Sequence, residues 1–101
     1  MIKVNYHVVD GDVIDFSVLG HADYKKSNGI DLVCACVSSI VIGGLNAIKD
    51  DKNYLMHVES GDVVVKVQKP NNDDNIVIKT IITQLKTLET KYSNNIVIKE
   101  L

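Results

Sequence analysis

The segment "IKVNYHVVDGDVIDFSV", residues 2–18, predicts the first structural unit of the chain. Apolar and polar side chains alternate from Ile2 to Val8, and they alternate again at Ile14, Phe16 and Val18. The sequence "DGD" separates the two runs. Alternation with a period of two residues on both sides of a glycine turn is typical of a β-hairpin. The fold therefore begins with two antiparallel strands.

A second hairpin and a last strand are predicted further along the chain. "YLMHVES" begins at Tyr54 and "DVVVKVQK" begins at Asp62, and the two runs form a hairpin around Ser60 and Gly61. The closing segment "NNIVIKEL", residues 94–101, reads as one more strand because it is short and rich in β-branched residues.

The uncharged run within residues 30–48 is too long for one strand, so it favours a helix with Asp31 as its N-cap. Leu32–Ile48 reaches only the lower length limit of a membrane span, and it contains serine, glycine and asparagine. We therefore expect a buried central helix and no membrane association. Within it, Gly43 and Gly44 lower helix propensity, which indicates close packing on another element.

A second helix is expected from about Asp73 to Lys91, because its apolar residues recur at helical spacing. The apolar positions are Ile78, Ile81, Ile82, Leu85 and Leu88. The full order is then β-β-α-β-β-α-β. We predict an α+β fold, with two helices on a mostly antiparallel sheet, in a single domain over residues 1–101.

Composition excludes several function classes. The chain has 101 residues, 46% hydrophobic residues and a formal net charge of −2, and its basic residues are all lysine. These features argue against nucleic-acid binding, because the chain has no excess of positive charge and no arginine to bind phosphates or guanine edges through paired hydrogen bonds. Two cysteines are not a disulfide framework, and the first residues lack a signal-peptide pattern. We expect a reduced, cytoplasmic protein.

The motif "NGIDLVCACVSS", residues 28–39, holds both cysteines. With Asp31 as N-cap, Cys34 falls in the first helical turn, where free N–H groups and the helix dipole favour a thiolate. Cys36 follows about 200° around the helix, so the two sulfurs face different sides and cannot readily bind one metal. We expect Cys36 to be a small core residue with a neutral thiol, and we expect no metal site and no cofactor.

His21 is the candidate base. It follows Gly20 at the end of a predicted strand, where its side chain can reach a neighbouring helix terminus. A cysteine beside a histidine is a nucleophile with a general base. One cysteine and one histidine remain a weak signal by themselves, because most helical cysteines are buried hydrophobes. His7 and His57 are expected to face solvent, and Ser38, one turn after Cys34, either lines a site or bonds back to a carbonyl.

The motif "GHADY" followed by "NGIDLVCACVSS" resembles the signature of the ribosomal-processing cysteine protease family of Firmicutes and related bacteria. That signature runs G-H-A, a variable loop, then G-x-D-x-V-C-A-A-V-S. The residues that match it are Gly20, His21, Ala22, Gly29, Asp31, Val33, Cys34, Ala35, Val37 and Ser38. Cys36 departs from the pattern, which commonly has alanine there.

The resemblance implies a function. Members of the family remove an N-terminal extension from a large-subunit ribosomal protein, number twenty-seven, and they form homodimers. The nucleophile corresponds to Cys34 and the histidine of the dyad to His21. Asp31, Gly20 and Ser38 are then candidates for binding or orienting the substrate. The loop Ala22–Asn28 corresponds to a family loop that moves on substrate binding.

Two other readings compete with the protease. A non-catalytic adaptor that binds the ribosome or another protein could share the fold, and alkylation would leave such an adaptor's activity untouched. A redox protein would need a resolving cysteine within reach of Cys34, and Cys36 faces another side of the helix.

Overall fold

The computed structural model describes residues 1–24, 31–48 and 51–101. The predicted order β-β-α-β-β-α-β is confirmed, with one short 3-10 helix, η1, added. The elements are β1 (Ile2–Val9), β2 (Asp12–Leu19), α1 (Leu32–Leu45), η1 (Asp51–Asn53), β3 (Tyr54–Glu59), β4 (Asp62–Val67), α2 (Asn72–Lys91) and β5 (Ile96–Glu100).

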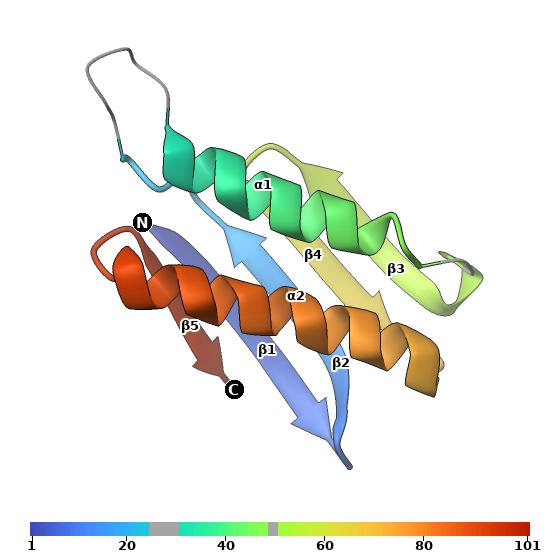
Figure 1. The fold of residues 1–101 in the computed structure, drawn as a ribbon. Helices are drawn as coiled ribbons and strands as arrows, with labels where there is room; N and C mark the ends of the chain where they lie inside the picture. The colour runs from blue at the N-terminus through green and yellow to red at the C-terminus, as the bar shows by residue number, and fades with distance from the viewer. Residues whose placement is uncertain (25–30, 49–50) are drawn as a thin grey trace.

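The strands form one five-stranded sheet in the order β3-β4-β2-β1-β5. Each neighbouring pair is antiparallel except β1 and β5, which run parallel because α2 carries the chain back across the sheet. Both helices lie side by side on one face of this sheet (Figure 1). The prediction of an α+β fold with a mostly antiparallel sheet is therefore confirmed.

The first hairpin differs in one detail from the predicted alternation. Phe16 lies opposite Tyr6 and Val18 opposite Val4, as a regular hairpin requires, but the register shifts between His7 and Val8. Beyond this irregularity Val13 is buried, whereas Ile14 is only partly buried. Ile14 therefore does not share the buried face of Phe16 and Val18, as unbroken alternation would require, because an extra residue in a ladder reverses the alternation.

The two helices cover the sheet with narrow apolar faces. In α2 the buried apolar residues include Ile78, Ile81, Ile82 and Leu85, as predicted. In α1 the buried residues are Val33, Val37, Val41 and Leu45, at a spacing of four. The prediction of a buried central helix is therefore only partly correct, because one face of α1 is buried and the other faces are not.

Glycine brings the helices close together. A Cβ atom at Gly44 would clash with the side chain of Ile81 on α2, whereas one at Gly43 would meet nothing within 4 Å. The predicted close packing is therefore confirmed for Gly44. In the part of the chain that is described, neither helix has the length and apolar composition needed to cross a membrane.

Candidate active site

The chain turns sharply where β2 ends. Gly20 has φ +95°, and a Cβ atom there would lie 2.5 Å from the carbonyl oxygen of Met1. Only glycine combines this backbone angle with so close an approach. The turn directs the exposed side chain of His21 toward the β3–β4 turn, where a Cβ atom at Gly61 would lie 2.7 Å from His21 Nε2.

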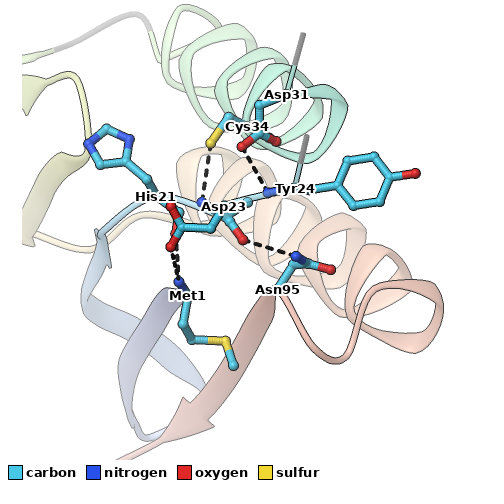
Figure 2. Close-up of polar contacts among 8 residues, drawn as sticks. Met1, His21, Asp23, Tyr24, Asp31, Cys34 and Asn95 are labelled. Atoms are coloured by element: carbon cyan, nitrogen blue, oxygen red, sulfur yellow. Dashed lines mark hydrogen bonds and ion pairs between the residues drawn. The ribbon is translucent and has the colours of Figure 1, made fainter. Parts of the chain in front are cut away.

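The predicted N-cap of α1 is confirmed. Asp31 has extended backbone angles, and its Oδ1 accepts a hydrogen bond of 3.0 Å from the backbone N–H of Cys34. Cys34 is half-buried in the first turn of the helix. Its Sγ atom accepts a hydrogen bond from the backbone N–H of Ala22 at 3.3 Å. The residue after His21 therefore contacts the sulfur directly (Figure 2).

Asp31 also links the two segments that carry His21 and Cys34. While Oδ1 caps α1, Oδ2 accepts a hydrogen bond of 3.2 Å from the backbone N–H of Tyr24 (Figure 2). One carboxylate thus joins the start of the helix to the chain just after the histidine. The next residues of the loop predicted over Ala22–Asn28 lie outside the described residues.

A cavity of about 310 Å³ lies between α1 and the ends of β2, β3 and β4. His21 and Cys34 both line it, together with Gly20 and Ser38. Asp31 is not among its lining residues, since its carboxylate lies at the helix cap. Much of the remaining wall is apolar and comes from Ile2, Val18, Val37, Val41, Ile42, Val58 and Val63.

The imidazole of His21 and the sulfur of Cys34 face the same cavity without a hydrogen bond between them among the described residues. Figure 2 shows the His21 ring on the side of the β3–β4 turn, pointing away from the Cys34 sulfur. A proton transfer between the two groups would require the imidazole to turn toward the sulfur, as catalytic contacts often tighten only when substrate binds.

The predicted lowering of the Cys34 pKa is wrong for this conformation. Burial raises the pKa of the thiol, and although the hydrogen bond from Ala22 lowers it, the carboxylates of Asp31 and Asp23 raise it further. The Asp31 pKa moves the opposite way. Burial alone would raise that pKa, but hydrogen bonds from Cys34, Tyr24 and Val33 lower it on balance. The thiol therefore keeps its proton beside a charged carboxylate.

Cys36 is not a core residue, and that prediction is wrong. Its side chain is exposed, because Cys36 lies outside the buried stripe of α1, which consists of Val33, Val37, Val41 and Leu45. It lines a second cavity, of about 500 Å³, between α1 and α2. The prediction that the two sulfurs face different sides agrees with their separate cavities.

Two parts of the site were not found from the sequence. One is the Ser60–Gly61 turn, which lines the cavity and lies against His21. The other is Asn95, whose Nδ2 donates a hydrogen bond of 2.9 Å to the carbonyl of Ala22 (Figure 2). Both contacts join segments distant in sequence, and a glycine turn and an asparagine before a strand are too common to signal them.

Neither of the other two histidines, His7 and His57, lines the cavity that contains Cys34. His7 is partly buried and contacts Asp15 at 2.7 Å, so the prediction that it simply faces solvent is incomplete. His57 is exposed, as predicted. With Glu59 and Asp62 it forms a group whose potential ligand atoms all lie within 4.8 Å of one another. That group could hold a metal ion, whereas the sequence predicts no metal site.

Comparison with known proteins gives consistent matches. The profile of the family described as "Cysteine protease Prp" matches residues 1–97. The ribosomal processing cysteine protease Prp of Staphylococcus aureus is 35% identical to this chain over 95% of both sequences.

The fold is also similar to solved structures. The S. aureus ribosomal processing protease Prp with a covalently linked product peptide superposes with a TM-score of 0.86, at 29% identity and over 100% of both chains. The same protease with a substrate peptide gives a TM-score of 0.82, at 27% identity and the same coverage. Both matches cover the whole chain, and so include both helices and all five strands. The chain is a cysteine protease and belongs to the cysteine protease Prp family.

Proposed function

We propose that this protein is an endopeptidase that removes the N-terminal extension of a precursor ribosomal protein, large-subunit protein number twenty-seven. Cys34 is the nucleophile and His21 the general base. The observation that carries the proposal is that both side chains line one cavity at the N-terminus of α1. The relatives described as ribosomal processing proteases support the substrate class.

The first chemical step follows from the state of the thiol. Because burial raises the pKa of Cys34, the resting sulfur carries a proton and needs a base to remove it. His21 takes that proton, and the sulfur attacks the carbonyl carbon of the scissile peptide bond. The N–H of Ala22, which already donates to Sγ, stabilises the negative sulfur before attack.

The second step releases the two products in turn. Protonated His21 gives its proton to the departing amine, the carbon–nitrogen bond breaks, and a thioester remains on Cys34. His21, now neutral, accepts a proton from a water molecule that attacks the thioester. The carboxylic acid leaves, and the proton returns to the sulfur.

The other predicted site residues, Asp31, Gly20 and Ser38, orient the two catalytic side chains or bind the substrate. Asp31 orients the site, since its carboxylate holds the N–H groups of both Cys34 and Tyr24. Gly20 permits the sharp turn that places His21. Ser38 is exposed on the cavity wall one turn after Cys34, where its hydroxyl can bind the backbone of a peptide.

The test is direct. The purified protein is mixed with the precursor ribosomal protein, and the products are identified by mass spectrometry. We expect one cut that shortens the precursor at its N-terminus, and no cut in the mature protein. Cleavage of unrelated unfolded proteins at similar rates would contradict the proposed substrate, whereas an intact precursor would contradict the proposed function.

We further propose that residues 1–101 act as one protease domain, as a homodimer, in the cytoplasm. Free cysteines agree with a reducing compartment, and exposed apolar side chains on β3, at Leu55, Met56 and Val58, agree with a surface that a second subunit covers. Light scattering during gel filtration should give twice the mass of one chain. The mass of a single chain at micromolar concentration would contradict the dimer.

A further inference from the structure

Gly61 lies directly against the imidazole of His21. A Cβ atom at this position would lie 2.7 Å from Nε2 and 2.9 Å from Cε1 of the ring. Carbon atoms in contact normally lie about 3.5–4.0 Å apart, so a side chain at residue 61 and the present ring position are incompatible. One of the two must move.

The turn that carries Gly61 is held in place. The backbone N–H of Gly20 donates a hydrogen bond of 2.9 Å to the carbonyl of Gly61, which ties the turn to the residue before His21. Antiparallel pairing of β3 with β4 holds it from the other side. The His21 imidazole, by contrast, is exposed and can rotate about its side-chain bonds. A side chain at residue 61 would therefore displace the ring and leave the turn where it is.

The first hairpin offers a contrast. Gly11 in the β1–β2 turn has φ +83°, and Gly61 has φ +72°, so both need the left-handed backbone that glycine adopts freely. A Cβ atom at Gly11, however, would meet nothing within 4 Å. At position 11 glycine is therefore needed only for the left-handed backbone angle. At position 61 it is also needed because a side chain would collide with the His21 ring.

We propose that Gly61 is a positioning residue, and that the missing side chain there sets the place of the His21 imidazole. The inference rests on the proposed role of His21 as general base. With a Cβ atom at residue 61, the ring must move into the space that the substrate carbonyl needs beside Cys34, or out into solvent. A ring that moves beside Cys34 blocks the scissile bond, and a ring that moves into solvent leaves the thiol without its base, while the peptide still binds along the rest of the cavity.

The test compares Gly61→Ala with Gly11→Ala, which impose similar backbone strain in the two hairpin turns. For Gly61→Ala we expect kcat to fall about 10-fold or more, against the ~10²–10⁴-fold that loss of a general base costs, with KM within about twofold of wild type. Gly11→Ala should keep both constants. The NMR signal of His21 Cε1–H should shift in the first variant only.

A second pair keeps the test informative if Gly61→Ala fails to fold. Asparagine tolerates the left-handed backbone better than alanine, so Gly61→Asn and Gly11→Asn repeat the comparison with less strain. Equal kcat and an unmoved His21 signal in the Gly61 variants would overturn the inference. His21→Ala separates the two failures, because an active His21→Ala protein would overturn the proposed role of His21 as general base.

Discussion

The two sides of α1 carry chemically identical thiols in different surroundings. On the side of the β3–β4 turn, Cys34 receives a hydrogen bond from Ala22 and shares a cavity with His21. On the side of α2, Cys36 is exposed. The described residues that line its cavity include Lys91 and Tyr92 but neither a histidine nor a carboxylate.

The comparison teaches that exposure and nucleophilic function are separate properties. Cys36 is the more accessible thiol, so simple alkylating reagents should reach it readily. Cys34 is half-buried with a raised pKa, yet among the described residues its cavity contains a histidine and the cavity of Cys36 does not. Activation by a positioned imidazole, rather than an intrinsically low pKa, is what distinguishes the two sides.

The largest effect is expected when the two thiols are removed in turn. Cys34→Ala should abolish cleavage of the precursor, since no other group in the cavity can form the thioester. Cys36→Ala should retain activity within about twofold, because its sulfur lies in the other cavity. Mass spectrometry of the cleaved precursor measures both, with circular dichroism to show that each variant is folded. The reverse pattern would mean that the nucleophile has been misassigned.

Loss of the base should be nearly as severe. His21→Ala should lower kcat by ~10²–10⁴-fold, the range typical for removing a general base. His57→Ala is a matched control, because His57 is exposed on β3 and is not among the lining residues of the cavity. Steady-state kinetics on both variants decide the point, and an equal loss in His57→Ala would remove the case for His21.

A smaller effect is expected at the helix cap. Asp31→Asn keeps a capping oxygen for the Cys34 N–H but removes the negative charge that helps raise the Cys34 pKa. The thiolate should then form at lower pH, so the midpoint of Cys34 alkylation should move down. The rate of alkylation against pH, measured in a Cys36→Ala background, tests this; a midpoint that stays or rises would contradict the role given to Asp31.

The smallest expected change concerns the stability of the helix that both thiols share. Gly44→Ala places a Cβ atom against Ile81 and should destabilise the fold by about 1–3 kcal/mol, as overpacking does. Gly43→Ala meets open space and should stabilise it by about 0.5–1 kcal/mol, because glycine weakens a helix interior. Urea unfolding of the two variants gives the free energies, and equal values would show that the α1–α2 contact is loose.

Local sequence patterns were sufficient for most of the fold. Alternation predicted the hairpins, and the stripe from Ile78 to Leu85 predicted α2 to within one residue. They failed for α1, where apolar residues occupy every side, so that periodicity could not tell the sheet-facing Val37 from the exposed Cys36. The bulge that brings Val13 inside also has no signal in the alternation.

The parts of the site that depend on residues close together in the sequence were predictable. Asp31 as N-cap and Cys34 in the first turn follow from neighbouring residues. The contact between His21 and Gly61 joins the end of β2 to the β3–β4 turn and depends on the pairing of β2 with β4, which sequence spacing does not reveal. The sign of the Cys34 pKa shift was missed for a related reason, because burial and carboxylate proximity are tertiary properties.

The most direct test of the central claim is to find which sulfur reacts with a substrate-like electrophile. A peptide with the residues that precede the cut in the precursor, ending in a chloromethyl ketone, is incubated with the wild-type protein, and the modified residue is identified by mass spectrometry. We predict one adduct per chain, on Cys34, blocked by excess precursor and strongly slowed in His21→Ala. An adduct on Cys36 that forms as fast and depends on the peptide in the same way would contradict the account.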